Sequence, residues 1–100
     1  MFTVSKTITA ENQFSGAFTP PQNPRHPKVG RFTLAITGTG WSATVTLQRS
    51  FDKGDSWEDV DTFSTNTQVN IEDLTDNIRY RVGVKTDDFG SGTLTAKFAK

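Results

Sequence analysis

Hydrophobic and polar residues alternate along much of the last seventy residues of the chain. In the stretch 31–38, Phe32, Leu34 and Ile36 share one face, and mostly polar residues share the other. A period of two predicts strands with one buried and one solvated face. The intervening residues of each such strand, among them Thr46 and Gln48, are therefore expected to face solvent. The other inward positions predicted in this way are Trp41, Ala43, Val45, Leu47, Ile78, Tyr80, Val82, Val84, Leu94, Ala96 and Phe98.

Three weaker patterns complete the set of expected strands. One runs from Trp57 to Phe63 and is irregular, because Trp57, Val60 and Phe63 do not alternate, and a β-bulge would reconcile them. Residues 67–71 and residues 2–9 supply the other two. No stretch predicts a helix of more than one turn. About seven short strands separated by turn residues predict an all-β fold, a small antiparallel β-sandwich of immunoglobulin-like or jelly-roll-like type.

The segment 14–30 interrupts this pattern. It contains all four prolines of the chain and shows almost no periodicity. Proline lacks a backbone donor and fixes φ, so the segment is predicted to be an extended loop or arm rather than a helix or a central strand. A chain of 100 residues fits one domain. We divide it into an N-terminal strand with a proline-rich arm, residues 1–30, and a β core, residues 31–100.

Charge and composition weigh against several functional classes. The eleven basic and eleven acidic residues cancel, whereas nucleic-acid binding normally needs a basic excess. The chain has no cysteine, so we expect no disulfide and no thiolate metal site. Its first residues contain no long apolar run and no cleavage pattern, so we expect neither a signal peptide nor a membrane span. These features predict a protein that is made in a cytoplasm and released by other means.

The stretch SFDKGDSW, residues 50–57, lies between two expected strands and is therefore predicted to be a hairpin turn. Asp52 can accept hydrogen bonds from backbone N–H groups in such a turn. Gly54 can adopt a positive φ without a steric penalty, and Trp57 can fold over the hairpin and bury its ring. The residues predicted to stabilise the turn are Ser50, Asp52, Gly54, Ser56 and Trp57.

The same five residues resemble the Asp-box, the Ser-x-Asp-x-Gly-x-Thr-Trp hairpin of sialidase propellers, with Ser56 in place of the usual threonine. In those proteins the box is repeated and lies away from the catalytic site, whereas it occurs once here. The resemblance implies a stable turn, and it does not imply glycosidase activity.

Other candidates for chemistry have structural explanations. The acidic cluster at 52–61 offers oxygen ligands that suit calcium, but the EF-hand spacing is missing and Lys53 lies within it. His26, the only histidine, lies in the proline-rich segment. Asp87 and Asp88 could perform glycosidic acid–base chemistry, yet the glycines that follow indicate a turn. No nucleophile elbow, phosphate loop or paired-histidine motif is present. We therefore predict no enzymatic activity and no cofactor, and calcium binding by the acidic cluster stays open.

Two longer runs, VTLQRSFDKGDSWEDVDTFSTN and YRVGVKTDDFGSGTLTAKF, resemble a group of short bacteriophage proteins encoded among virion structural genes. The shared pattern is LQRS-F-D-x-G-x-S/T-W, YRVGV and SGT, and the resemblance covers residues 31–100. It implies a β-sandwich component of the virion and brings no catalytic residue. The first candidate is a capsid decoration (cement) protein whose partners are the major capsid protein and sister copies. The second is a tail or head–tail accessory protein.

A carbohydrate-binding module is the alternative from another class. Such modules often present exposed aromatic rings on one sheet face. Trp41 and Trp57 are the two candidates for stacking on a sugar, although both have explanations as core residues. A glycan is therefore a less favoured ligand than a protein partner.

The N-terminal third is the predicted partner-binding region. A polar, proline-broken segment cannot easily bury large apolar side chains by itself, and apolar groups left at a surface mark interfaces. Prolines also restrict the segment before binding, which lowers the cost of ordering it. For residues 2–9 the alternative is a strand of the same sandwich. The predicted contact residues are Phe2, Phe14, Phe18, Pro20, Pro21, Pro24 and Pro27.

Overall fold

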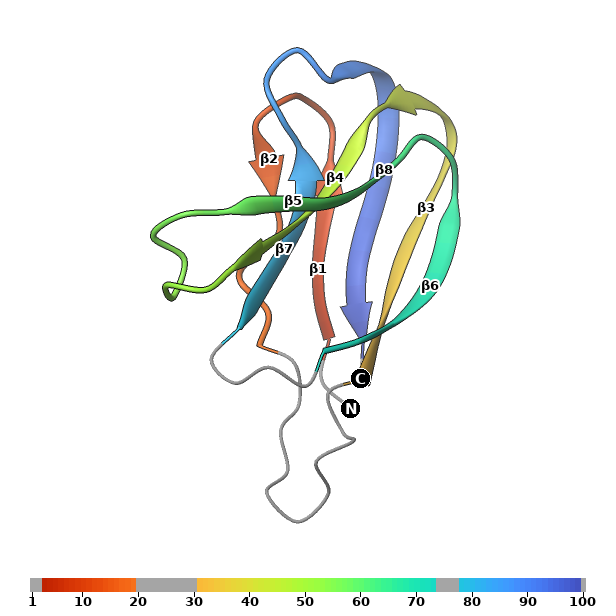
Figure 1. The fold of residues 1–100 in the computed structure, drawn as a ribbon. Helices are drawn as coiled ribbons and strands as arrows, with labels where there is room; N and C mark the ends of the chain where they lie inside the picture. Colours follow the sequence, from red (N-terminus) through yellow and green to blue (C-terminus); the bar gives the residue numbers. More distant parts are fainter. Residues whose placement is uncertain (1–2, 20–30, 74–77, 100) are drawn as a thin grey trace.

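Eight β-strands run through residues 3–19, 31–73 and 78–99, the part of the chain described by this computed structural model (Figure 1). The strands are β1 (Thr3–Ile8), β2 (Gln13–Phe14), β3 (Arg31–Ala43), β4 (Val45–Ser50), β5 (Glu58–Phe63), β6 (Thr67–Glu72), β7 (Arg79–Val84) and β8 (Phe89–Ala99). These residues contain no helix, and so none that could cross a membrane. The predicted all-β class is confirmed. The count exceeds the expected number because β2 lies in the segment predicted to be an arm.

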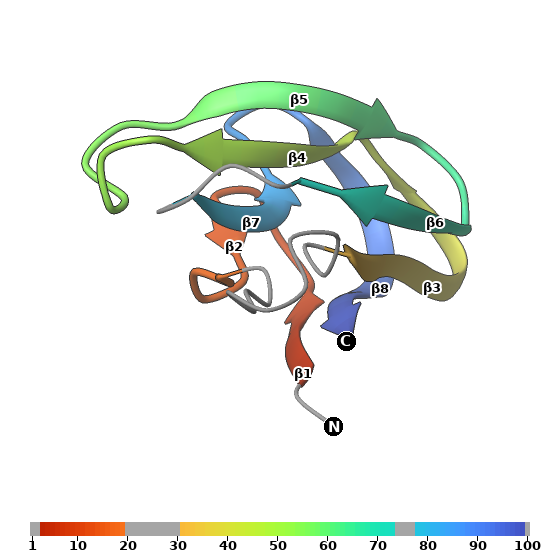
Figure 2. The same cartoon turned by 60° about the horizontal axis from the view of Figure 1, so that its bottom comes forward.

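The strands form two antiparallel sheets of four strands each. The first sheet has the order β1-β8-β3-β6, and the second has the order β2-β7-β4-β5. Figure 2 shows β4 and β5 of the second sheet on one side of the molecule and β3 and β8 of the first sheet on the other. Strands β5 and β6 follow each other in the sequence but are edge strands of different sheets. The chain therefore passes from one layer to the other between them.

The apolar faces of the two sheets meet in one core. The inward positions predicted in β3, β7 and β8 from Phe32 to Ile36, Tyr80 to Val84 and Leu94 to Phe98 are at most 3% exposed. Trp41 and Ala43 are half-buried and pack against this core. Alternation therefore predicted the core-facing residues of these strands correctly, because each strand has one side against the opposite sheet.

Phe18 lies in the centre of this core. Its backbone N–H donates to the Tyr80 carbonyl at 2.7 Å, and its own carbonyl accepts from the Tyr80 N–H at 2.8 Å. Its ring is 0% exposed, stacks on Phe98 with 5.0 Å between centroids, and lies 5.1 Å from the Phe32 ring. The prediction that Phe18 contacts a partner is therefore wrong. Backbone pairing with a distant strand draws this ring inward, and no local pattern in the sequence indicates that pairing.

Strands β1 and β2 also belong to the sandwich. Strand β1 pairs with β8 along its whole length, so the alternative of an N-terminal strand in the same fold is the correct one. Strand β2 pairs with β7 at Gly83, where any side chain would collide with the Gln13 carbonyl oxygen. Phe14 is half-buried there. The remaining predicted contact residues lie outside the described part of the chain, namely Phe2, Pro20, Pro21, Pro24 and Pro27.

Strand β4 is buried on both faces, contrary to the alternation. Thr46 is 0% exposed and Gln48 is 6% exposed, so the prediction that they face solvent is wrong. The strand lies between β5 and β7. Side chains from both neighbours cover its outer face, since Arg81 of β7 and Asp59 of β5 both bond to Gln48.

The bulge predicted in β5 is confirmed. Leu47 of β4 pairs with Asp61, and the next residue, Gln48, pairs with Asp59. Val60 is therefore the extra residue, and its side chain is 46% exposed.

Candidate functional site

The turn between β4 and β5, residues 50–57, is organised around the carboxylate of Asp52. Its Oδ1 accepts hydrogen bonds from the Ser50 hydroxyl at 2.7 Å and the Ser56 backbone N–H at 2.9 Å, and Oδ2 accepts one from the Ser56 hydroxyl. These bonds, with the Ser56 hydroxyl first and Ser50 second, lower the pKa of Asp52 from 3.8 to about 2. Gly54 has a φ of +94° and its N–H donates to the Ser50 hydroxyl oxygen at 2.8 Å. Four of the predicted turn residues thus form one network.

Trp57 lies beside this turn but outside the core. Its side chain is half-buried, and a Cβ at Gly54 would lie 3.6 Å from the ring atom Cζ2. The guanidinium carbon of Arg81 lies over this ring, 4.5 Å from the ring centroid. The indole therefore packs against the outer face of the second sheet. The sequence predicted a buried ring, whereas the ring is only half-buried.

Arg81 connects the turn to the outer face of the second sheet. Its guanidinium carbon lies over both the Phe14 and the Trp57 ring, at 4.2 and 4.5 Å from their centroids. Its Nε–H donates to Gln48 Oε1 at 2.7 Å, and Gln48 Nε2 donates to Asp59 Oδ1 at 2.9 Å. Burial lowers the pKa of Arg81. We call Phe14, Gln48, Trp57, Asp59, Arg81 and Lys85 the Arg81 network.

Lys85 closes this network at the other end. Its ammonium donates to Asp59 Oδ2 at 2.7 Å, and this bond is the main cause that lowers the pKa of Asp59 and raises the pKa of Lys85. Sequence reasoning missed the network because its members come from four separate segments. Alternation with the inward residues Ile78, Tyr80 and Val82 places Arg81 on the outer face, but it does not indicate the partners of Arg81.

A second polar group joins the ends of three strands. The Tyr80 hydroxyl donates to Asp73 Oδ2 at 2.7 Å, and Arg49 Nη1 lies 3.3 Å from the same oxygen. The Asp73 side chain is only 6% exposed, so these two donors compensate a carboxylate removed from water. Burial is the main cause that raises the pKa of Tyr80 to about 12, with the bond to Asp73 second. This arrangement is structural, because it keeps the phenol protonated and the carboxylate paired.

The two tryptophans do not form a platform for a sugar. Trp41 belongs to β3 of the first sheet, and its Nε1–H donates to Asn66 Oδ1 at 2.8 Å. Trp57 precedes β5 of the second sheet and stacks on Arg81. Their rings come from different layers of the sandwich, and neither is fully exposed. No pair of parallel, open rings therefore supports the carbohydrate-binding alternative.

The acidic candidates are turn and network residues. Within residues 3–19, 31–73 and 78–99, no group of three or more His, Cys, Asp or Glu side chains is placed to hold a metal ion. Asp88 donates its N–H to the Lys85 carbonyl at 3.1 Å, and Asp87 has a φ of +68°. These two residues therefore lie in a turn, as their sequence context predicts. His26 lies outside the described residues.

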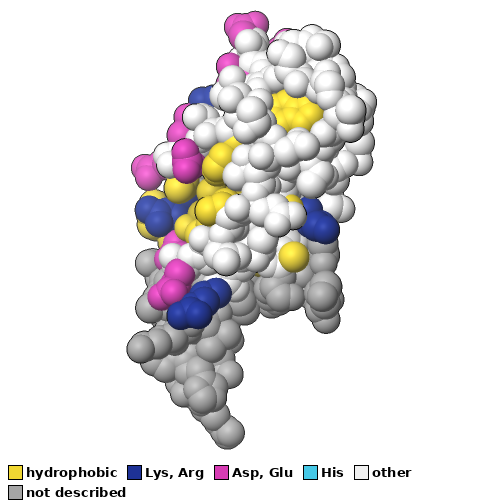
Figure 3. Space-filling model, turned by 90° about the vertical axis from the view of Figure 1, so that its right-hand side faces the viewer, with side chains coloured by type: hydrophobic (Ala, Val, Ile, Leu, Met, Phe, Trp, Pro, Cys, Tyr) yellow, Lys and Arg dark blue, Asp and Glu magenta, His cyan; other side chains and the backbone are white. Residues whose placement is uncertain are grey.

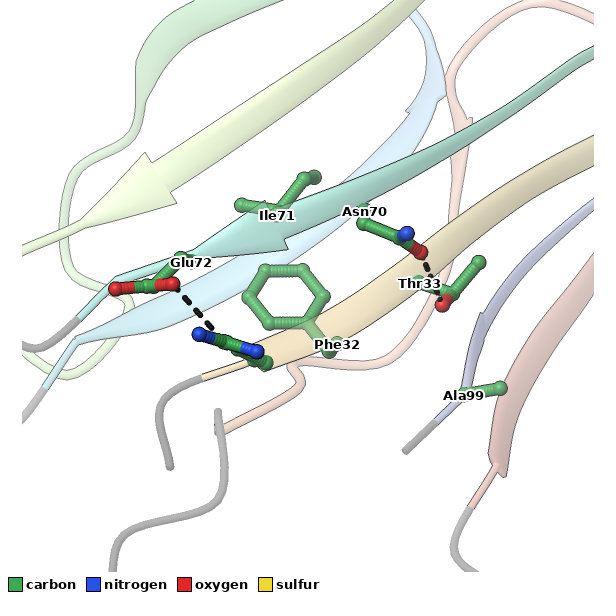
Figure 4. Close-up of a pocket in the computed structure, with 7 residues that line it drawn as sticks. Phe32, Thr33, Asn70, Ile71, Glu72 and Ala99 are labelled. Carbon is green, nitrogen blue, oxygen red and sulfur yellow. Dashed lines mark hydrogen bonds and ion pairs between the residues drawn. The ribbon is translucent and has the colours of Figure 1, made fainter. Parts of the chain in front are cut away.

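An open pocket of about 590 Å³ lies at the start of β3 and the end of β6 (Figure 4). Arg31 Nε lies 3.0 Å from Glu72 Oε2, and the Thr33 hydroxyl donates to Asn70 Oδ1 at 2.9 Å. Figure 4 shows these two pairs bridging the strands beside the Phe32 ring. The polar groups of this pocket are thus paired with each other, and none is a nucleophile next to a free base.

Apolar side chains reach the surface beside β5 and β6, which are edge strands of the two sheets. Figure 3 shows that side of the molecule, with apolar side chains between a border of acidic and basic residues and a mostly uncharged polar surface. Val60 is 46% exposed, and Phe63, Val69 and Ile71 are half-buried. We call these four residues of β5 and β6 the apolar strip. Exposed apolar groups of this kind are typical of protein contact surfaces.

No protein-family model, no curated protein and no solved structure matches this chain.

Proposed function

We propose that the protein is a non-enzymatic structural protein of a bacteriophage virion, a decoration protein that binds the head shell. The resemblance of residues 31–100 to short virion proteins supports the assignment of this protein to a virion. The apolar strip supports binding to another protein, and it is the observation that carries the proposal. The partners are then the major capsid protein and sister copies on the shell.

The edges beside the strip offer a physical way to bind a shell subunit. Strands β5 and β6 each have one neighbour in their sheet, so each has a row of backbone N–H and C=O groups on its other side. A strand of a shell protein can pair with such an edge while its apolar side chains pack against the strip. The exposed acidic residues Glu58 and Asp61 on β5 would orient the partner through its charges.

The size of the strip suggests how a shell would use it. A stable interface buries about 800 Å² on each partner, which is more than four partly exposed side chains can supply. A single copy should therefore bind weakly through the strip alone. Sister copies that also contact each other on a symmetric shell would raise the overall affinity without new chemistry.

The test is binding of purified variants to undecorated head shells of the phage that encodes the protein. Val60→Asp places a charge in the apolar strip, and its occupancy should fall at least about tenfold because the charge must be desolvated on binding. Thr62→Asp is the matched control, since Thr62 is an exposed residue of the same strand outside the strip. Unchanged occupancy of Val60→Asp would contradict the strip as the docking surface. Binding of the wild type to tails and not to heads would favour the tail accessory alternative.

The proline-rich segment is tested separately. Replacing residues 20–30 by a short Gly/Ser linker keeps Phe14 and Phe18, which belong to the fold. If the prolines help to bind the shell, occupancy should fall while the melting temperature stays unchanged. Wild-type occupancy would leave the strip as the sole docking element.

A further inference from the structure

Arg81 on the outer face of the second sheet is held in one orientation by three neighbours. Its guanidinium carbon lies over the Phe14 ring and over the Trp57 ring, 4.2 and 4.5 Å from their centroids. Its Nε–H donates to Gln48, a residue 6% exposed that is itself bonded to Asp59. Two stacked rings and one in-plane hydrogen bond leave the guanidinium little freedom to rotate.

The two terminal amino groups of Arg81 donate to no residue in the described segments. Its one hydrogen bond there is the bond from Nε to Gln48. Its pKa is nevertheless lowered by burial, so the group has lost part of its hydration. A donor that is partly removed from water and unpaired costs free energy that an acceptor would restore. The fork of Arg81 is therefore preorganised for an acceptor supplied by another molecule.

Arg81 lines an open pocket of about 440 Å³ that is rich in donors. The main side-chain acceptors in it are engaged, since Gln48 Oε1 accepts from Arg81 and Asn12 Oδ1 accepts from the Thr86 hydroxyl at 2.6 Å. The donors that remain are the Arg81 fork, the Asn12 amide and the free hydrogens of the Lys85 ammonium. A neutral sugar needs acceptors as well as donors, whereas a carboxylate needs donors only. The lining residues are Asn12, Phe14, Gln48, Arg81, Lys85 and Thr86.

The charges around the pocket favour a single negative charge. Arg81 and Lys85 line the pocket with two positive charges, while Asp59, 2.7 Å from Lys85, and Asp88, which also interacts electrostatically with Lys85, are negative. Glu58 and Asp61 are exposed on the adjacent strand β5 and add negative potential. A phosphate dianion or a polyanion would be repelled by these carboxylates. These carboxylates repel a ligand with a single negative charge less strongly than a dianion or a polyanion.

We propose that the Arg81 pocket binds the carboxylate of an aspartate or glutamate side chain presented by a protein partner. The two carboxylate oxygens accept from the two terminal amino groups in the parallel fork geometry that arginine favours. The methylene groups of the bound side chain contact the Phe14 ring. The hydroxyl groups of a sugar cannot make this apolar contact. The pocket is separate from the apolar strip, so this inference does not depend on whether the partner is a head shell.

The experiment is an NMR titration of the intact protein, read at the Arg81 side-chain Nε–H. The probe is a capped Gly-Glu-Gly peptide, and the same peptide with Gln in place of Glu is the control ligand. We expect a saturable shift with a dissociation constant on the order of millimolar for the Glu peptide, because one bidentate contact supplies only a few kcal/mol, and no saturable shift for the Gln peptide.

Two variants show whether the fork itself binds. Arg81→Lys keeps the charge and removes the fork, so the affinity, followed through backbone amides, should fall at least about tenfold. Arg79→Lys is the matched control on the same strand, because Arg79 donates to the Lys53 carbonyl and does not line the pocket, and it should bind as the wild type does. If Arg81→Lys fails to fold, Phe14→Leu decides, since loss of one stacked ring should weaken binding several-fold.

Three results would overturn the proposal. The first is no saturable shift with the Glu peptide, and the second is equal affinity of the wild type and the pocket variant that folds. The third is tighter binding of glucuronate than of the Glu peptide, which would assign the pocket to an acidic sugar. None of these results bears on the head-shell proposal, because the Val60→Asp assay reports on a different surface.

Discussion

The outer faces of the two sheets are built from different side chains. The first sheet carries cross-strand rows of short uncharged residues, such as Thr7, Thr95 and Thr37 on adjacent strands. The second sheet carries a row of long polar residues, with Gln48 between Arg81 and Asp59. Thr7 and Thr37 of this row stay exposed to solvent. Long side chains and the rings stacked on them cover the strand beneath, so a central strand becomes buried on both faces.

The largest expected effect is at Phe18, which joins the two sheets. Phe18→Ala should destabilise the fold by about 3–5 kcal/mol, because the ring is fully buried between Phe32 and Phe98 and its loss leaves a cavity. Urea unfolding followed by tryptophan fluorescence measures this change. Thr37→Ala, on the exposed face of the first sheet, is the control and should lie within about 0.5 kcal/mol of the wild type. Equal stabilities of the two variants would mean that Phe18 does not lie in the core.

The next effect distinguishes the two outer faces directly. Gln48→Leu should cost about 1–3 kcal/mol, because it leaves the partly buried Nε–H of Arg81 without an acceptor. Gln68→Leu makes the same chemical change on the outer face of the first sheet, where the side chain is exposed, and should be nearly neutral. Chemical denaturation of both variants tests the comparison. If both substitutions cost the same, the two faces do not differ as the structure indicates.

The smallest effect is a dependence on pH at the β4–β5 turn. The pKa of Asp52 in the folded protein, about 2, lies below its ordinary value of 3.8. The ionised carboxylate therefore stabilises the fold above about pH 4, and this contribution is lost as the pH falls through about 2. The melting temperatures of the wild type and Asp52→Asn should therefore become more similar as the pH falls from about 4 to about 2.

A control separates this effect from the loss of charge alone. Asp55→Asn removes one charge from the same turn, where no described side chain bonds to the Asp55 carboxylate. A difference between wild type and Asp52→Asn that stays constant down to pH 2 would contradict the hydrogen-bonded network around Asp52.

Much of the fold could be predicted where one face of a strand is exposed to solvent. The alternation in β3, β7 and β8 reports directly on which side chains meet the opposite sheet, so their inward positions were correct. The turn at 50–57 was also predictable, because its bonds join residues no more than four apart in the sequence. The irregular alternation from Trp57 to Phe63 predicted a bulge in this strand, and the structure places it at Val60.

The sequence by itself thus determined the all-β class, the inward faces of the strands and the residues of one turn, because local spacing encodes all three. Only the tertiary structure decided that Phe18 fills the core, that β4 is buried on both faces, and that Arg81 contacts two aromatic rings. Each depends on strand pairing between distant segments, such as the 33 residues that separate Gln48 from Arg81. Local periodicity reports which face of a strand is buried, but it carries no information on which strand becomes its neighbour.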